Sequence, residues 1–299
     1  MMTTVAFTGA VELGLIYALL ALGIFVSYRI LGVADLTVEG SFTAGASVCA
    51  ILTVAGYPFL GIMLAAIIGA LSGLCSAFLQ TKMRIQPILA GILTMTALYS
   101  VNLAVMGGRA NIALLREETL FTVFARHANN GRLLIPFFVV LTISIFLSIF
   151  FHTRLGLSVR ATGDNEDMVR ASSVNSTFTK SIGLAMGNAL AALSGALIAQ
   201  YQGFADIGMG FGMVVVALAS LIIGEAIFGR RTVIWNIGAV VAGAVIYRII
   251  LALVLSFRLN PANLRAISAL IVAIAISYPA AKSLWEVYML KRRAAQGNA

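Results

Sequence analysis

Residues 9–28 read GAVELGLIYALLALGIFVSY, an apolar run whose one charged side chain is Glu12. A helix rises about 1.5 Å per residue, so about 20 such residues cross the hydrocarbon core of a bilayer. The run has no basic leader before it, so we expect it to remain as the first membrane span and not to be cleaved as a signal peptide. The stretch therefore predicts a chain that folds in lipid.

The composition of the whole chain agrees with a lipid environment. Of 299 residues, 61% are hydrophobic and 10% are charged, whereas soluble domains carry about 25% charged residues. This excludes a water-soluble globule, a disordered chain and a disulfide scaffold. We expect one all-α polytopic membrane domain, residues 1–299, with about nine transmembrane helices, some of them broken. Apolar runs place these spans at 9–28, 36–55, 59–80, 86–107, 132–152, 181–203, 213–229, 232–256 and 264–281.

The lysine and arginine residues predict the orientation, because positive charge is retained on the cytoplasmic side during insertion. One orientation places most of the 20 basic residues inside, with the N-terminus outside and the C-terminus in the cytoplasm. The net charge of +9 then reflects topology and contact with lipid, so no nucleic-acid partner is expected. The spans at 36–55 and 213–229 are candidates for broken or partly inserted helices, since the first opens with acidic residues and the second is short and flanked by glycine.

Two hydrophilic segments separate the expected spans. Residues 108–131 form an extracytoplasmic loop of mixed charge that can hold a short surface helix. Residues 153–180, TRLGLSVRATGDNEDMVRASSVNSTFTK, form the longest cytoplasmic loop. Asp164 or Asn165 can cap a helix there, with acidic residues in its favourable first turn. We expect a short helix at the cytoplasmic face, and the alternative is a solvated linker.

The motifs of several enzyme classes are absent from the sequence. There is no Gly-x-x-x-x-Gly-Lys-Ser/Thr loop for ATP and no Gly-x-Ser-x-Gly elbow. His127 and His152 are expected on opposite sides of the membrane, so they do not share a metal ion. Cys49 and Cys75 lie in apolar runs, where a thiol behaves as a small hydrophobe, so no disulfide is expected. These absences favour a non-catalytic membrane protein with no cofactor or metal of its own.

Few polar side chains lie within the expected spans, and each has a structural and a functional interpretation. Arg248 snorkels outward or pairs with Glu12 or Asp206, and the alternative is that it lines a translocation path. Asn102 and Asn188 form hydrogen bonds between helices, and the alternative is that they contact cargo.

Tyr201 and Phe204 lie near the outer end of a span, where an aromatic belt and a substrate gate are the two interpretations. The acidic residues, such as Glu39, lie at the ends of spans. An ion-coupled secondary transporter keeps charged ligands deep in the bilayer, so this placement argues against that class. The secondary transporter remains the alternative, and it predicts loss of transport when Glu39 is neutralised. A passive channel is a third hypothesis.

The tetrapeptide Ala-Leu-Ser-Gly occurs at 70–73 and again at 192–195. The two spans that hold it are expected to run in opposite directions, as in the inverted repeat of a transporter. Small residues also recur in membrane helices because they let backbones approach, so helix packing is the simpler interpretation.

The cytoplasmic loop gives a more specific indication. Residues 160–175, RATGDNEDMVRASSVN, resemble the loop of permease subunits of bacterial ABC importers in the branched-chain amino acid, ribose and nucleoside permease family. Residues 189–203, ALAALSGALIAQYQG, are similar to the small-residue helix that follows this loop, and residues 32–45, GVADLTVEGSFTAG, to the segment after the first helix. Order and spacing fit over residues 9–281. The Asp-Leu-Thr-Val-Glu-Gly motif at 35–40 looks most like the tryptophan/tyrosine-type permeases.

This resemblance implies a type II-like ABC importer permease with inverted repeats, in the bacterial plasma membrane, for a small polar solute such as an amino acid. It implies a homodimer with two copies of an ATPase subunit that bind ATP and Mg. It also implies a substrate-binding protein that docks outside near 108–131, 204–212 and 257–263. A coupling helix at 163–172 is implied to contact the ATPase through Gly163, Asp164, Asn165, Glu166, Asp167, Met168 and Arg170. The candidate residues of the substrate pathway are Glu39, Asn102, Asn188, Tyr201, Phe204 and Arg248.

Overall fold

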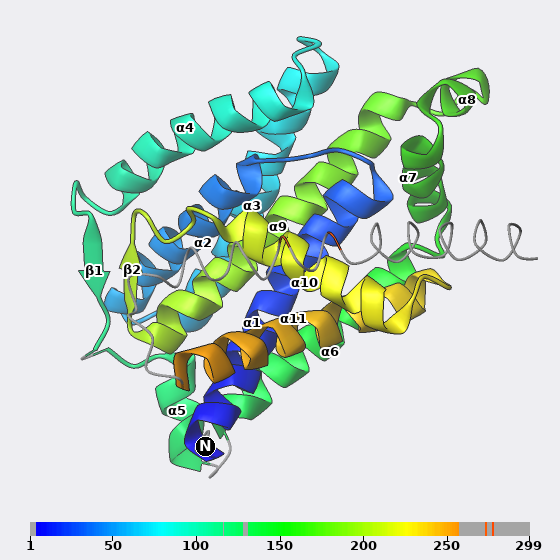
Figure 1. The fold of residues 1–299 in the computed structure, drawn as a ribbon. Coiled ribbons are helices and arrows are strands. Elements are labelled where there is room, and N and C mark those ends of the chain that lie inside the picture. Colours follow the sequence, from blue (N-terminus) through cyan, green and yellow to red (C-terminus); the bar gives the residue numbers. More distant parts are fainter. Residues whose placement is uncertain (1–3, 116, 128–130, 257–272, 274–276, 278–299) are drawn as a thin grey trace, which may run out of the picture.

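A computed structural model describes residues 4–115, 117–127, 131–256, 273 and 277 as an almost entirely helical fold (Figure 1). In chain order its elements are α1 (Thr4–Ile24), the π-helix η1 (Phe25–Ile30), α2 (Thr37–Val54), α3 (Pro58–Thr81), α4 (Pro87–Val105), β1 (Asn111–Ala113), α5 (Leu120–His127), α6 (Gly131–Phe150), α7 (Arg154–Asp164), α8 (Glu166–Ala171), α9 (Ser176–Gln202), β2 (Phe204–Asp206), α10 (Met213–Phe228) and α11 (Val233–Ser256). Within these residues, 7 helical segments are long and apolar enough to cross a membrane. The chain is therefore a multi-pass membrane protein.

The first eight expected spans each correspond to a helix, with ends that differ by a few residues. The span expected at 213–229 is short, as its sequence predicted, because α10 has 16 residues. The expected ninth span at 264–281 and the outer segment at 257–263 lie outside the described residues, except for two single positions.

Local sequence signals set several of these helix ends. Pro58 and Pro87 occupy the first turns of α3 and α4. Backbone N–H groups in the first turn have no partner within the helix, so the N–H that proline lacks is not needed there. Asn175 caps α9 by accepting a hydrogen bond from the backbone N–H of Phe178 at 3.2 Å. Gly203 ends α9 with φ of 78°, a left-handed conformation that glycine adopts without strain.

The buried centre of the bundle is formed by α1, α2 and α9 (Figure 1). Small residues let these helices approach closely. A Cβ atom on Gly45 would lie 2.0 Å from the carbonyl oxygen of Ala192, and one on Gly195 would lie 1.9 Å from that of Phe42. The outer faces of α3, α4 and α6 expose large apolar side chains, as expected for surfaces in contact with lipid acyl chains.

The helix α3 packs along α9 through its own glycines. Cβ atoms on Gly69 and Gly73 would lie 2.5 Å and 2.3 Å from the carbonyl oxygens of Asn188 and Leu184. Both Ala-Leu-Ser-Gly tetrapeptides thus lie on two helices in close contact. Helix packing is sufficient to explain their small residues.

Two further features connect the bundle to its ends. The strands β1 and β2 pair antiparallel, with Ile112 opposite Ala205, and so join the loop after α4 to the segment after α9. This ladder and the helices α7 and α8 lie at different ends of the molecule in Figure 1. At the end of the first span, η1 is a π-helix, a rare form that is frequent at functional sites.

Candidate functional site

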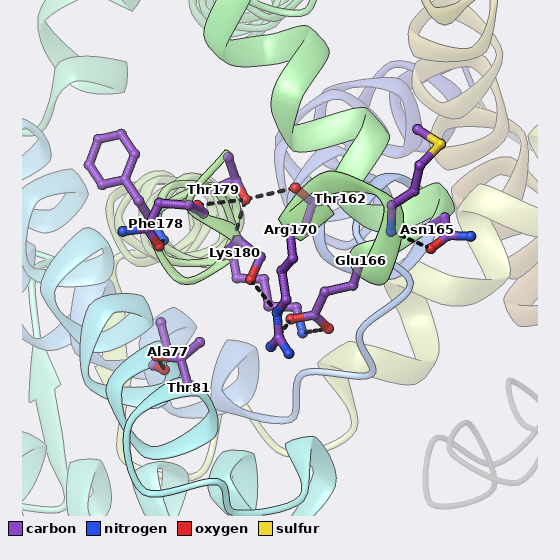
Figure 2. Close-up of polar contacts among 12 residues, drawn as sticks. Ala77, Thr81, Thr162, Asn165, Glu166, Arg170, Phe178, Thr179 and Lys180 are labelled. Atoms are coloured by element: carbon purple, nitrogen blue, oxygen red, sulfur yellow. Dashed lines mark hydrogen bonds and ion pairs between the residues drawn. The ribbon is translucent and has the colours of Figure 1, made fainter. Parts of the chain in front are cut away.

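The loop at 153–180 folds into two short helices, α7 and α8, which meet at Asn165. The expectation of one helix over 163–172 is wrong, because Asn165 has an extended backbone with φ of −158° and ψ of 101°. Its side-chain oxygen accepts a hydrogen bond from the backbone N–H of Met168 at 2.9 Å and so caps α8 (Figure 2). Gly163 and Asp164 therefore end α7, and α8 begins after the cap.

Glu166 organises the ion pairs of this two-helix unit (Figure 2). Its carboxylate contacts the Arg170 guanidinium at 2.7 Å and the ammonium group of Lys180. The Nε atom of Arg170 also donates a hydrogen bond to Ser176 Oγ at 3.0 Å. Burial alone would raise the pKa of Glu166, but the hydrogen bond from Lys180 and the charges of Lys180 and Arg170 outweigh burial and lower the pKa. Glu166 thus holds α8 against the start of α9.

Two contacts connect the α7–α8 unit to the buried membrane helices. The hydroxyl groups of Thr162 and Thr179 share a hydrogen bond of 2.7 Å (Figure 2). Gly163 lies so close to η1 that a Cβ atom there would be 1.8 Å from the carbonyl oxygen of Ile30. The helix α7 is therefore in direct contact with both η1 and α9.

Most of the predicted coupling residues are exposed on the surface of the unit, including Asn165 and Arg170, whose side chains also bond within it. Asp164, Asp167 and Met168 are exposed as well, and 58% of the Met168 surface is accessible. Methionine adapts its shape to a partner surface, and the surrounding charges add polar contacts. This outward edge is suited to docking another subunit.

Both candidate asparagines form hydrogen bonds between helices. The fully buried Asn188 donates from Nδ2 to the Asp35 carboxylate at 2.6 Å and accepts from Ser41 Oγ at 2.7 Å. Asn102 donates to the carbonyl oxygen of Gly40 at 3.2 Å. These bonds tie α9 and α4 to the start of α2, which is the geometry that the structural interpretation predicts.

Glu39 lies where the starts of α2 and α10 meet. Its Oε1 atom accepts hydrogen bonds from the backbone N–H groups of Gly212 at 3.0 Å and Val214 at 3.4 Å. Glu39 and Asn102 line one cavity of about 150 Å³. The structure thus brings together two of the predicted pathway residues.

The other candidate pathway residues lie outside that cavity. The Tyr201 hydroxyl donates to the Glu12 carboxylate at 2.8 Å. Phe204 lines a second cavity, of about 370 Å³. The guanidinium of Arg248 lies over the ring of Tyr17, 3.6 Å from the ring centroid.

The expected pairing of Arg248 with Glu12 or Asp206 is wrong. A cation–π contact takes the place of the ion pair, because the side chain of Arg248 reaches an aromatic face. Asp206 instead accepts a hydrogen bond from the backbone N–H of Gly208 at 2.8 Å.

An ion cluster that no sequence pattern predicted lies at the far end of α10. The Glu225 side chain, 6% exposed, pairs with Arg29 of η1 at 2.9 Å and with Arg230. The nearby Arg230 is a local signal for this cluster, but the contact with Arg29 arises only from the tertiary fold. Together with Glu39, the cluster fastens α10 at both of its ends.

Comparison with known proteins yields one family and two relatives. Residues 7–277 match the model of the family described as "Branched-chain amino acid transport system / permease component". A tyrosine transport system permease protein of Clostridioides difficile (strain R20291) is 34% identical over 259 residues, which are 86% of this chain and 86% of that protein. An uncharacterized protein of Rickettsia prowazekii (strain Madrid E) is 36% identical over 273 residues, 90% of this chain and 95% of its own length.

Among solved structures, a chain from an inward-facing metal-chelate type ABC transporter resembles this one with a TM-score of 0.50. The match covers 93% of this chain and 85% of that chain at 16% sequence identity. A likeness at this identity is a likeness of fold. The helical arrangement in Figure 1 is therefore one that an ABC transporter also uses.

Proposed function

Because this chain belongs to the family of permease components of branched-chain amino acid transport systems, we propose that it forms the membrane pathway of an importer driven by a separate ATPase subunit. As the permease component of an ABC transporter, it is a membrane subunit. In this proposal the chain performs no covalent chemistry, and the ATPase binds ATP and Mg.

The observation that carries this proposal is the α7–α8 unit. Its outward edge, with Asp167 and Met168, is exposed, while its inner side is packed on η1 and α9 through Gly163 and Thr162. A subunit that docks on α8 and moves can transmit that movement to helices in the bundle centre. We assign the docking edge to the ATPase.

The proposed assembly contains two copies of this chain and two ATPases, related by a two-fold axis. A substrate-binding protein is proposed to dock on the loops at 108–131 and 204–212, which the β1–β2 ladder holds together. The distribution of basic residues supports an orientation with α7 and α8 in the cytoplasm and the N-terminus outside a bacterial plasma membrane.

The proposed cargo is an amino acid, with tyrosine as the leading candidate. The 34% identity to a tyrosine transport system permease protein over 86% of both chains supports this choice.

Purification from the native membrane tests the ATPase assignment. Glu166 is unsuitable for this test because it holds the unit together, so we choose the double variant Asp167→Lys/Met168→Glu on the exposed edge. The wild-type chain is expected to copurify with an ATP-binding subunit. The double variant is expected to recover at least about tenfold less of that subunit, because two contact residues that together contribute about 1.4 kcal/mol change the dissociation constant about tenfold.

Glu118→Lys is the matched control, since it also reverses an exposed charge. Glu118 lies in the loop before α5, and its ion pair with Arg126 is on the surface. It should retain the ATPase. If the wild-type chain copurifies with no ATP-binding subunit, the ion-coupled secondary transporter takes the place of this proposal.

A further inference from the structure

The cavity of about 150 Å³ beside Glu39 lies between α2, α4 and the segment at 207–211 that leads into α10. An engineered cavity of about this volume encloses a benzene ring. The lining includes the apolar side chains of Met95, Tyr99 and Phe211, together with the polar ones of Glu39 and Asn102. The cavity thus combines space for one ring with a carboxylate at its wall.

The carboxylate of Glu39 is only partly satisfied by the protein. The hydrogen bonds from Gly212 and Val214 both reach Oε1, and Oε2 has no hydrogen-bond partner among the described residues. In the same part of the chain, no lysine, arginine or histidine forms an ion pair with Glu39. Within the part of the chain that the structure describes, the wall of the cavity therefore carries a carboxylate oxygen without a cationic partner.

Other buried or half-buried carboxylates of the bundle have side-chain partners, whereas the described partners of Glu39 are both backbone N–H groups. Glu225 pairs with arginines, Glu12 accepts from the Tyr201 hydroxyl, and Asp35 accepts from Asn188. A carboxylate that is partly withdrawn from water is costly in a membrane protein unless a cation or further donors stabilise it. A positively charged group of a solute in this cavity would supply that stabilisation.

We propose that this cavity binds the primary ammonium group of the transported solute, with Glu39 as its ion-pair partner and Tyr99 and Phe211 against its ring-sized body. The aromatic faces add attraction for a cation as well as apolar contact. An acyl chain of a lipid would gain nothing from the carboxylate. This inference rests on the proposed function and names the chemical class of its substrate as an aromatic or apolar primary amine.

Binding of tritiated tyramine to the full chain in lipid nanodiscs, measured by scintillation proximity, tests the inference. Tyramine carries the ammonium group and the ring without a carboxylate. Unlabelled L-tyrosine should compete with it, and 3-(4-hydroxyphenyl)propionate, which lacks the amine, should not. Glu39→Gln should weaken tyramine binding about tenfold or more, because a charged hydrogen bond contributes about 1.5–3 kcal/mol.

Two further variants make the test specific. Glu39→Gln keeps an oxygen that can accept from Gly212, so its fold should be preserved. Glu12→Gln is the matched control, because it also neutralises a half-buried glutamate in a membrane helix but lies outside the cavity lining, and it should bind tyramine as the wild type does. Tyr99→Leu, on an exposed face of α4, should weaken tyramine binding by about threefold through loss of the cation–π contact.

The inference is overturned if wild-type chain does not bind tyramine, if Glu39→Gln binds it unchanged, or if the propionate competes as well as tyrosine does. This result is separable from the ATPase test. Copurification of an ATPase without tyramine binding would remove only the inference, and tyramine binding without an ATPase would remove only the ATP-driven mechanism.

Discussion

At the scale of single residues, the ion pairs of Glu166 make the α7–α8 unit sensitive to acid. The pKa of Glu166 is lowered in the folded chain from its ordinary value of 4.5. The stabilisation is therefore complete above that value and is lost as the pH falls through the lower folded-state pKa. We expect hydrogen exchange of the α8 amides, corrected for intrinsic rates, to become faster below about pH 4.5.

The variant Glu166→Gln should remove this pH response and make the α8 amides exchange faster at neutral pH. The free energy of opening of α8 should fall by about 1 kcal/mol, as for a partly exposed ion pair. Asp167→Asn is the control, because its side chain is exposed and takes part in no ion pair among the residues described. A pH response that persists in Glu166→Gln would contradict the role of this carboxylate.

Gly163 gives a second prediction at this scale. Gly163→Ala places a Cβ atom 1.8 Å from the carbonyl oxygen of Ile30, so backbone must move. We expect a loss of about 2 kcal/mol in stability, typical of overpacking, measured as a lower thermal midpoint in detergent. Gly238→Ala, where a Cβ atom meets nothing within 4 Å, should leave the midpoint unchanged or raise it, since alanine favours a helix by up to about 1 kcal/mol.

Residue patterns predicted local chemistry better than long-range partners. A cap at Asp164 or Asn165 follows from the residue types before the acidic pair, and the structure shows that Asn165 is the cap. The cation–π contact of Arg248 depends on where α1 lies beside α11, which no spacing in the sequence specifies. The same holds for the approach of Gly212 to Glu39.

At the scale of elements, α10 is a short helix fastened at both ends. The Glu225 side chain is buried, whereas that of Arg29 is 34% exposed, so water can partly solvate the arginine after its partner is neutralised. Glu225→Gln should therefore lower the thermal midpoint by the loss of a charged hydrogen bond, which contributes about 1.5–3 kcal/mol. The double variant Glu225→Gln/Arg29→Gln should be less destabilised than the sum of the two single variants.

Glu117→Gln, in the loop after β1, serves as a neutralisation control for that cycle and should leave the midpoint unchanged. Strict additivity of the Glu225 and Arg29 substitutions would show that the contact contributes nothing to stability.

Hydropathy predicted the membrane helices because lipid requires about 20 apolar residues per span, and this rule needs no tertiary information. It predicted α10 as a short element for the same reason. The break between α7 and α8 and the π-helical turn of η1 depend on hydrogen bonds of single residues, so an apolar count does not find them.

At the scale of the whole molecule, the proposed orientation predicts which end is accessible from outside the cell. In a chain that lacks Cys49 and Cys75, a cysteine in place of Phe124 of α5 should react with an impermeant maleimide on intact cells. A cysteine in place of Met168 of α8 should react only after permeabilisation. Both positions are exposed, with accessible fractions of 45% and 58%, so equal reactivity in intact cells would exclude the orientation.

The candidate cavity shows why a fold can be predicted more fully than a site. Its lining residues come from α2, α4 and the segment before α10, and nothing in the spacing of Glu39 and Asn102 indicates that they share a wall. Each of the two residues was predicted separately to belong to the substrate pathway. Only the packing of helices distant in the chain shows which of the candidates lie together.

The π-helical turn at the end of the first span also determines a rotational register. An α-helix turns by about 100° per residue, and a π-helix accommodates more residues in each turn. If η1 tightened into an α-helix, the residues beyond the turn would rotate about the helix axis, and Arg29 and Ile30 would leave Glu225 and Gly163 at the same moment. Both contacts thus depend on the number of residues in the π-helical turn Phe25–Ile30 as well as on their side chains.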